Sequence, residues 1–505
     1  MPVELLTGSL IGVEAVTVHV EVDILRRLPS IQIVGLAASS VRESTERVRS
    51  ALTAVGHAWP RGRIIVNLAP AGLRKEGTGF DLPIAVGILA AGQSLPARCL
   101  SDRLFVGELS LSGALRPVRG VLSLALMARA SGLKQVIVPE ANGGEAALVE
   151  GLDVRVAGDL AAVLEHLVGK RTLPRARLSA PAPVSAALDL AEVRGQSLAR
   201  RALEVAAAGG HNLLLVGPPG CGKTLLASRM PSILPEMTPD EAVDVTRIHS
   251  AAGVLPQGCG LALQRPFRAP HHSVTPAAMV GGAGLRPGEL TLAHRGVLFL
   301  DELPEFRRDV LELLRGPMEN REVVLSRARG TVRFPAGFAL VASANPCPCG
   351  FRGHPTKACG CTPASIRRYA ARFSGPLMDR IDLRVEVPAL ESHELLGVRA
   401  GEASSVVQRR VDLARRLQSK RSAVVSCRRN AELRIEQARR AAMCCPAAHR
   451  LLALAVDRRG MSARGYVRVL RVARTIADLD GVQSVGESHV AEALQFRAFD
   501  GAGGV

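Results

Sequence analysis

Short apolar runs bounded by polar residues alternate with helical stretches along the first third of the chain. Residues 30–34 (SIQIV), 63–68 (RIIVNL) and 134–138 (KQVIV) predict strands, because each is a compact run rich in β-branched residues. Residues 43–55 repeat apolar positions at helical spacing and predict an amphipathic helix. The pattern therefore predicts a mixed α/β domain over residues 1–170.

The pattern changes twice further along the chain. Residues 171–187 (RTLPRARLSAPAPVSAA) combine proline, alanine and serine without periodicity, which is typical of a linker. A second α/β pattern follows over 188–388. From 389 to 505 the pattern is almost wholly helical, with clear amphipathic stretches at 406–418 and 464–479. The chain is therefore expected to hold two α/β domains and a C-terminal helical lid.

Composition adds a strong positive charge to this picture. Hydrophobic residues make up 47% of the 505 residues, which excludes a mainly disordered or fibrous protein. The formal net charge is +18, with one net positive charge over 1–170, nine over 171–390 and eight over 391–505. This balance favours a polyanionic partner, although an arginine-rich solvated surface would give the same count. Aromatic residues are only 3%, so nucleic acid would be held through phosphates with little sequence preference.

The expected cellular compartment follows from features that the sequence lacks. No apolar run reaches the length of about 18 residues that a membrane span needs. The first residues carry two glutamates and no basic region, unlike a secretory signal. Ten cysteines in a chain of this size do not resemble a disulfide scaffold. We therefore expect a cytoplasmic protein with no membrane partner.

The most specific motif is a phosphate-binding loop. It matches G-x-x-x-x-G-K-[ST] at every fixed position, between an apolar run at 213–216 and a helical stretch. Glycines let the backbone N–H groups of such a loop point at phosphate oxygens. Lys223 is expected to reach the outer phosphates of a nucleotide, and the Thr224 hydroxyl to bind Mg²⁺. The loop residues are Gly217, Pro218, Pro219, Gly220, Cys221, Gly222, Lys223 and Thr224.

Two further apolar runs end in polar residues suited to nucleotide hydrolysis. The run at 297–300 ends in Asp301 and Glu302, roughly 80 residues after the loop. Asp301 is expected to hold the Mg²⁺ shell, and Glu302 to polarise the attacking water. The run at 338–344 ends at Asn345, which either contacts the γ-phosphate or is an ordinary strand-to-loop residue. The phosphate loop and the Asp301–Glu302 run together predict hydrolysis of a nucleoside triphosphate rather than nucleotide storage.

Four cysteines follow Asn345 in two C-x-C pairs, with His354 between the pairs. Four thiolates suit tetrahedral Zn²⁺ in a reducing compartment. A redox-active pair and unrelated loop cysteines are alternatives that the spacing leaves open. The cysteines are Cys347, Cys349, Cys359 and Cys361.

The order of these motifs resembles that of the AAA+ ATPases. The amino-acid sequences of the motifs are similar to those of the magnesium-chelatase-like branch and its YifB/ComM subfamily. The similarity covers nearly the whole chain. The resemblance implies that Arg380 is an arginine finger for the neighbouring subunit's nucleotide, in a homo-hexamer. It implies that Arg464 closes the helical lid over the same nucleotide. The segments that carry it are 266–273 (PFRAPHHS), 344–350 (ANPCPCG), 374–383 (SGPLMDRIDL) and 462–466 (SARGY).

The first domain resembles the proteolytic domain of Lon, a ribosomal S5 domain 2-like fold, through residues 77–83 and 106–113. The nucleophilic serine of Lon falls at Gly79 here, and its dyad lysine at Leu122. Acyl chemistry needs both a nucleophile and a base. The resemblance therefore implies a catalytically inactive domain for ring assembly or partner docking.

A β-hairpin is predicted over 320–335, with Arg327 and Arg329 near its tip. Related ring motors insert a hairpin at this place into the central pore, so the two arginines are expected to contact DNA phosphates. An ordinary surface hairpin is the alternative interpretation.

A second hairpin-like stretch at 253–268 offers Arg265 and Arg268 as further pore-lining candidates. His271 and His272 follow it. Because no third ligand stands at a convincing spacing, a packing or hinge role is expected for them rather than metal binding.

The resemblance as a whole implies an ATP-driven ring motor on DNA. It would migrate branched junctions during homologous recombination in natural transformation, with recombination proteins as partners. A metal-insertion chaperone ATPase of the magnesium-chelatase type is one alternative. An ATP-gated assembly adaptor without motor activity is another.

Overall fold

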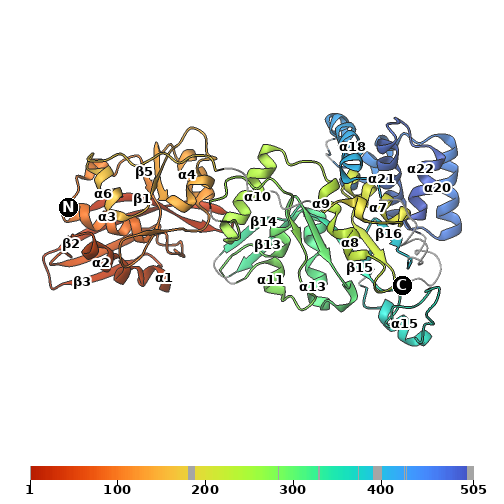
Figure 1. Cartoon of the computed structure of the whole chain (residues 1–505), viewed down its shortest axis with the longest axis horizontal. Helices are drawn as coiled ribbons and strands as arrows, with labels where there is room; N and C mark the ends of the chain where they lie inside the picture. The colour runs from red at the N-terminus through yellow and green to blue at the C-terminus, as the bar shows by residue number, and fades with distance from the viewer. Residues whose placement is uncertain are drawn as a thin grey trace.

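The computed structural model describes residues 2–179, 188–256, 258–282, 284–327, 330–373, 375–389, 401–425, 427 and 429–497, without the side chains of 327, 330, 423–425 and 459. We call 2–179 the N-terminal part, 188–389 the central part and 401–497 the helical part. Figure 1 shows the three parts in this order along the longest axis of the molecule. The first two parts each contain a sheet covered by helices, which confirms the predicted mixed α/β class.

The N-terminal part is built on a seven-stranded sheet of order β3-β4-β2-β1-β5-β8-β9. The alternation of β2 places Val18, Val20 and Val22 on one buried face, against α3 and α4. The predicted strands and helix are present as β3, β4, β8 and α2. The strands are β1 Val3–Ile11, β2 Glu14–Leu25, β3 Ser30–Val34, β4 Arg63–Ala69, β5 Arg103–Phe105, β8 Gln135–Pro139 and β9 Asp153–Ala157, beside a small pair β6 Glu108–Leu109 and β7 Leu115–Arg116. The helices are α1 Ser39–Arg42, α2 Ser44–Ala54, α3 Asp81–Ala91, α4 Val121–Ala130, α5 Gly143–Ala146 and α6 Leu160–Leu167.

The central part contains a five-stranded sheet of order β11-β12-β15-β10-β16, and every neighbouring pair in it is parallel. β10, β12 and β15 are buried along their whole length, as continuous apolar runs in a parallel sheet should be. These three are the strands predicted from the apolar runs before the phosphate loop, Asp301 and Asn345. The strands are β10 Leu213–Val216, β11 Phe267–Arg268, β12 Val297–Leu300, β15 Ala339–Ala344 and β16 Leu383–Glu386.

Helices surround this sheet, and a hairpin leaves it. β13 and β14 pair antiparallel from Glu322 opposite Pro335 to Arg327 opposite Gly330, which confirms the predicted hairpin. The hairpin consists of β13 Glu322–Arg327 and β14 Gly330–Pro335. The helices are α7 Ser197–Gly209, α8 Lys223–Ser228, α9 Met230–Ile233, α10 Pro239–Ala252, α11 Pro276–Val280, α12 Glu289–Leu292, α13 Arg308–Leu313, α14 Arg315–Asn320, α15 Pro363–Ala370 and α16 Gly375–Met378.

The helical part packs against α7 and shares its hydrophobic core. A buried polar network crosses the same contact: the His211 ring bonds Asp382 on one side and Thr475 of α21 on the other, at 3.3 and 2.8 Å. The predicted amphipathic stretches lie within α18 and α21. The helices are α18 Ser404–Val425, α19 Ile435–Ala442, α20 Pro446–Arg459, α21 Ala463–Leu479 and α22 Glu487–Gln495.

Two of the contacts between the N-terminal part and the central part involve buried residues. The turn between β1 and β2 sits on the hairpin: Val13 is 1% exposed within the core that contains Phe334, and a Cβ on Gly12 would lie 2.7 Å from Val332. At the other place, Ser250 of α10 donates its hydroxyl to the buried carboxylate of Glu145 and accepts at its carbonyl from the backbone of Gly120.

The predicted linker begins as part of the N-terminal part. Backbone bonds join Val156 to Pro174 and Ala176 to Val154, beside β9. Residues 180–187 of the predicted linker lie outside the described residues. Among the helices that the structure describes, none is both long enough and apolar enough to span a membrane.

Candidate nucleotide site

The predicted site residues meet at the carboxyl edge of the five-stranded sheet. Val216 at the end of β10 lies opposite Ala344 at the end of β15, and Leu300 at the end of β12 lies opposite Ala342. The loops that follow these three strands therefore leave the sheet side by side. They carry the phosphate loop, the Asp301–Glu302 pair and Asn345, which the structure brings together.

Three glycines give the phosphate loop its path. Gly220 and Gly222 have φ angles of +79° and +93°, in the left-handed region that other residues rarely adopt. A Cβ on Gly217 would lie 2.2 Å from the carbonyl oxygen of Val387. A side chain at any of the three positions would therefore displace the loop.

Lys223 points its ammonium into the loop. Its Nζ donates to the carbonyl oxygens of Gly217 at 2.7 Å and Pro218 at 2.9 Å, and to Oδ1 of Asn345 at 3.1 Å. Burial lowers the pKa of Lys223, because the charged form loses hydration there. A phosphate group entering the loop would supply the negative charge that this amine lacks.

Asp301 and Thr224 form the second half of the site. The Thr224 hydroxyl donates to Oδ2 of Asp301 at 2.9 Å, so a hydroxyl and a carboxylate oxygen converge on one point. Oxygen ligands of this kind suit Mg²⁺, and the two residues could hold it. Neighbouring Glu302 has a φ of +55°, a strained conformation that positions its side chain at the strand end.

Ser343 is a site residue that the sequence analysis missed. It is fully buried in β15, where its hydroxyl donates to Oδ1 of Asp301 and accepts from the backbone N–H of Glu302 at 3.0 Å. It therefore fixes both acidic residues at once. The signal available was a single hydroxyl inside an otherwise apolar strand (ALVASA).

Arg380 lies at the other edge of the sheet from the phosphate loop. Its backbone carbonyl accepts from the side chain of Asn212, the residue immediately before β10, whereas the loop begins immediately after β10. The four residues of β10 separate these two points by about 13 Å. The Arg380 guanidinium pairs with Glu319 and donates to the carbonyl of Pro376 at 2.6 Å.

Arg464 lies beside Arg380, the residue with which it is expected to share a nucleotide. Its guanidinium is 3.6 Å from Asp379, the neighbour of Arg380, and α21, which carries Arg464, packs on α7. Both arginines line a cavity of about 730 Å³, which we call the amino-edge cavity. Of the described residues that line it, none belongs to the phosphate loop; Arg321, Arg434, Arg468 and Arg471 add further positive charge.

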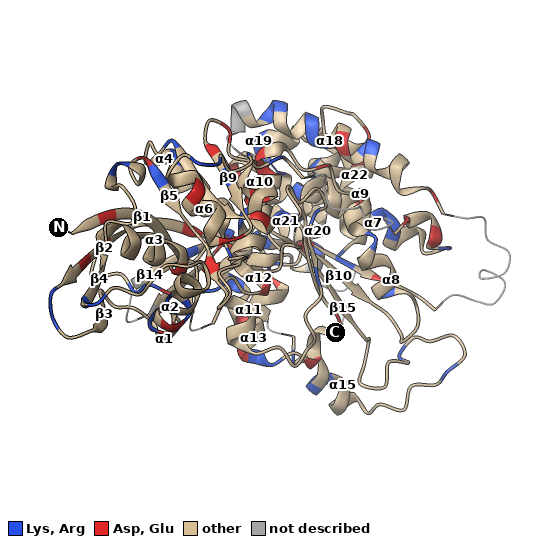
Figure 2. Ribbon diagram, turned by 60° about the vertical axis from the view of Figure 1, so that its left-hand side comes forward, with Lys and Arg blue, Asp and Glu red and all other residues tan. Residues whose placement is uncertain are grey.

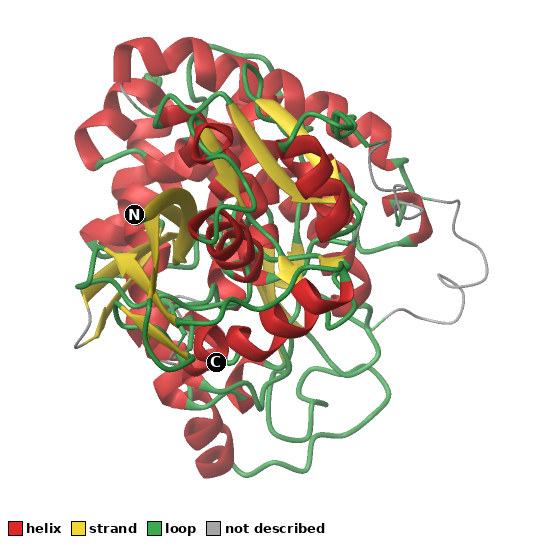
Figure 3. Ribbon diagram, turned by 90° about the vertical axis from the view of Figure 1, so that its left-hand side faces the viewer, coloured by secondary structure: helices red, strands yellow, loops and turns green. Residues whose placement is uncertain are grey.

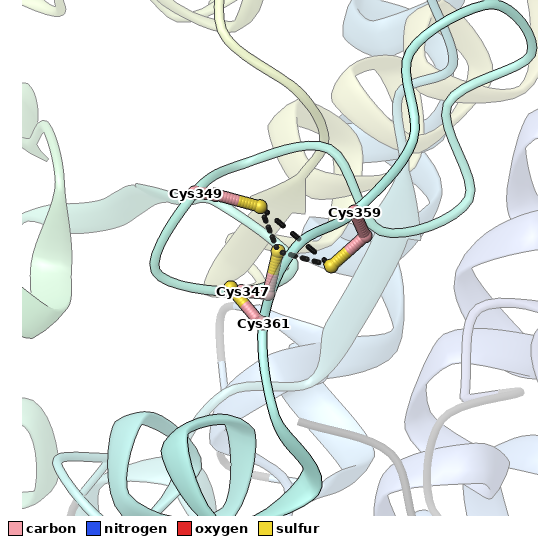
Figure 4. Close-up of side chains that lie close together, drawn as sticks. All are labelled: Cys347, Cys349, Cys359 and Cys361. Atoms are coloured by element: carbon pink, nitrogen blue, oxygen red, sulfur yellow. Dashed lines mark hydrogen bonds between the residues drawn. The ribbon is translucent and has the colours of Figure 1, made fainter.

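The four cysteines converge on one point (Figure 4). Their sulfur atoms all lie within 4.8 Å of one another, with 3.4 Å between Cys347 and Cys349 and 3.7 Å between Cys347 and Cys359. Sulfur ligands around a tetrahedral zinc are separated by about 3.8 Å, given zinc–sulfur distances of about 2.3 Å. His354 instead accepts hydrogen bonds from Thr356 and Lys357 of its own turn. The cluster could therefore hold a metal ion through sulfur alone.

The structure describes the side chains of only some of the arginines that are predicted to contact DNA. Arg329 and the side chain of Arg327 lie outside the described residues. Arg265 is engaged by Glu241 at 2.9 Å, and Arg268 forms a two-bond pair with Glu289 at 2.7 Å for each bond. These two arginines are thus occupied in holding the central part together.

The histidine pair shows packing contacts. The rings of His271 and His272 lie 4.0 Å apart, and His272 meets Phe306 edge to face. Within the described ranges, the cysteine cluster is the one group of His, Cys, Asp and Glu side chains close enough to hold a metal. The two histidines are consistent with the expected packing role.

Gly79 and Leu122, the positions that the resemblance matches to the Lon dyad, have side chains with neither a nucleophile nor a base. Gly79 lines a cavity of about 420 Å³ between the N-terminal and central parts. Leu122 is fully buried, and its backbone N–H donates to the carboxylate of Glu145. Leu122 is thus part of the contact between the N-terminal and central parts that also includes Ser250.

Comparison with known proteins agrees with the site. Family models described as "Magnesium chelatase, subunit ChlI", "Subunit ChlI of Mg-chelatase" and "Magnesium chelatase, subunit ChlI C-terminal" match residues 189–395, 20–142 and 401–497. Competence protein ComM of Haemophilus influenzae is 44% identical, over 96% of each chain. The uncharacterized protein YifB of Escherichia coli is 43% identical over 98% of this chain and 96% of its own. Lon protease 2 of Bacillus subtilis is 28% identical over 32% of this chain and 31% of its own. The chain therefore belongs to the magnesium-chelatase-like AAA+ family, in its YifB/ComM subfamily.

Proposed function

We propose that this chain is an ATP-driven DNA motor that works as a homo-hexamer and moves branched junctions during homologous recombination of incoming DNA. One observation carries the proposal: the phosphate loop and Arg380 lie at opposite edges of one sheet. The relative from Haemophilus influenzae is named a competence protein, which supports the link to incoming DNA. Recombination proteins are the partners that such a role requires.

The carboxyl edge would bind and hydrolyse ATP. Lys223 would donate to the outer phosphates, and Asn345, bonded to Lys223, would lie beside the γ-phosphate. Mg²⁺ held by Thr224 and Asp301 would neutralise charge on the phosphate oxygens. Glu302 would orient the attacking water and take its proton.

The amino-edge cavity would complete the site of a neighbouring chain. Arg380 and Arg464 cannot reach the phosphate loop of their own chain across about 13 Å of strand. A second chain that places its nucleotide against this cavity would meet both guanidiniums. Such a head-to-tail contact closes into a ring when the rotation between neighbours allows it, and the family resemblance supports a ring of six subunits. On this proposal Arg464 serves the neighbour's nucleotide, as Arg380 does.

Positive charge outside the nucleotide site supports DNA as the partner. Seventeen of the eighteen net charges lie beyond residue 170. Basic residues recur along α18 and on α19 (Figure 2). Contacts of this kind bind phosphates without reading bases, so binding would be independent of sequence and sensitive to salt.

Replacing both Arg327 and Arg329 by alanine should weaken DNA binding and reduce the salt slope of binding by about two, because two phosphate contacts are lost. ATP hydrolysis without DNA should stay at the wild-type rate. Fluorescence anisotropy of labelled duplex at several salt concentrations measures the effect. The matched control replaces Arg26 and Arg27, an exposed pair in the N-terminal part. An unchanged affinity and slope would contradict the role of the hairpin.

The cysteine cluster would hold zinc. Four sulfur donors at tetrahedral spacing favour Zn²⁺ over Mg²⁺ and Ca²⁺, which prefer oxygen ligands. Such a site is structural, because it leaves no coordination position open.

A metal-insertion chaperone ATPase is the second candidate, since the matching family models are described by a magnesium chelatase subunit. The two functions differ in what DNA does to the enzyme. DNA should stimulate hydrolysis by a motor and leave that of a chelatase subunit unchanged.

The deciding experiment is a branch-migration assay on a labelled four-way junction. Wild-type protein with ATP should convert the junction into two duplexes, and the Lys223→Ala variant should not. Assembly on DNA without movement of the junction would indicate the adaptor function instead. DNA-independent hydrolysis with no movement would favour the chelatase-like function.

A further inference from the structure

The cysteine cluster is directly connected to the nucleotide site. Cys347 follows two residues after Asn345, whose side chain bonds Lys223 at 3.1 Å. The segment between Asn345 and α15 is loop and turn throughout its described length (Figure 3). Because no helix or strand lies within its described length, side-chain contacts contribute to holding the excursion in place, and the four sulfurs form one such cluster.

The near end of the excursion rests on the phosphate loop. Gly350 has a φ of +81°, and a Cβ on it would lie 2.6 Å from Cδ of Pro219. Gly350 is also held by a backbone bond from its N–H to the carbonyl of Cys347 at 3.0 Å. The turn that carries Cys347 and Cys349 is thus in contact with the loop that binds phosphate.

The far end of the excursion returns to Asn345. Cys361 is followed by Thr362, which caps α15 by accepting from the N–H of Ser365 at 3.2 Å. α15 places Tyr369, which is 8% exposed, against the backbone of Asn345, where the two form a hydrogen bond. Both ends of the cysteine excursion therefore converge on one residue of the nucleotide site.

We infer that Cys347, Cys349, Cys359 and Cys361 form a metal-held brace that positions Asn345 and Pro219 for ATP hydrolysis. Binding of Zn²⁺ closes the excursion between its two ends and fixes the turn at Gly350. The cysteines act as positioning residues, since they touch Asn345 and the phosphate loop through the chain rather than touching ATP. The inference rests on the proposed ATPase activity and adds a metal requirement to it.

The first test removes the metal. Full-length Cys359→Ser/Cys361→Ser protein should lose bound Zn²⁺, measured by elemental analysis, and the visible absorption of a Co²⁺–thiolate complex after reconstitution with cobalt. The kcat for ATP without DNA should fall about 10- to 100-fold, because a misplacement of about 1 Å at a catalytic group has this cost. The affinity for a fluorescent ATP analogue should change much less, since Lys223 stays in place. Zinc loss with an unchanged kcat overturns the inference.

The second test keeps the metal and disturbs the brace. Gly350→Ala leaves all four thiols but pushes a methyl group into Pro219, so zinc content should stay at one per chain while ATP hydrolysis falls. Gly360→Ala is the matched control in the same loop, because a Cβ there meets nothing within 4 Å and its φ is ordinary. Equal ATPase rates in the two zinc-loaded variants overturn the inference even if the cysteine variant does not fold.

The two tests separate this inference from the proposed function. If the wild-type chain hydrolyses ATP and moves junctions while the brace variants match it, the brace is wrong and the motor stands. If the wild-type chain does not hydrolyse ATP, the proposed function fails at its first step.

Discussion

Replacing Lys223 by alanine should reduce ATP turnover about 100- to 1000-fold and abolish junction movement. The ammonium is the donor that the structure aims into the phosphate loop, and the variant leaves Asn345 without its hydrogen-bond partner there. Phosphate release at saturating ATP measures the effect. Lys170→Ala, which removes an exposed cation far from the loop, should behave as wild type.

The Lys223→Ala variant also has an expected effect on the thermal midpoint of unfolding. Burial lowers the pKa of Lys223, so removal of the amine also removes a desolvation cost. The thermal midpoint without nucleotide should therefore be preserved, and the shift of the midpoint caused by ATP should disappear. Turnover that survives the substitution would contradict the assignment of this loop as the ATP site.

Replacing Arg380 by alanine should lower turnover about 10³- to 10⁵-fold while ATP binding is retained. The guanidinium lies at the amino edge of the sheet, so its loss leaves the phosphate loop of the same chain untouched. The charge that it supplies is needed when negative charge spreads over the γ-phosphate oxygens. Nucleotide affinity and single-turnover hydrolysis, measured on the same sample, separate the two effects.

Mixing the two inactive variants tests whether one chain completes the site of another. In rings assembled from equal amounts of Lys223→Ala and Arg380→Ala chains, about a quarter of the interfaces pair an intact phosphate loop with an intact finger. Co-expressed and co-purified rings should regain a clear fraction of wild-type turnover. Rings that stay inactive, or a monomer that turns over at the full rate, would contradict action between chains.

The strands of the nucleotide site and the functional residues that follow them could be predicted, because the patterns that indicate them lie close together in the sequence. β10, β12 and β15 are continuous apolar runs, and each is followed at once by its functional residue, so strand and site residue are found together. The parallel register then follows from the fold class. The hairpin at 322–335 was predictable for the same reason, since its pairing is between neighbours in sequence.

What could not be predicted depends on contacts between distant segments. The position of Arg464 beside Asp379 requires the packing of α21 on α7, which no spacing in the sequence records. The contact between Gly350 and Pro219 joins residues more than a hundred positions apart. The ion pairs of Arg265 and Arg268 could not be predicted either, because their partners, Glu241 and Glu289, are brought to them only by the fold. β1 and β2 carry clear alternation yet were not among the predicted strands.

The contact of the β1–β2 turn with the hairpin links the N-terminal part to the element that the proposed motor would move. Val13 shares a buried core with Phe334. Gly12 lies so close to Val332 that the β1–β2 turn cannot slide along the hairpin. If the hairpin shifts with each ATPase cycle, the N-terminal sheet would therefore move with it. A small displacement of the hairpin would become a larger displacement at the far end of the sheet. In the proposed ring, the N-terminal parts would then move in step with hydrolysis, and a protein bound to them would move as well.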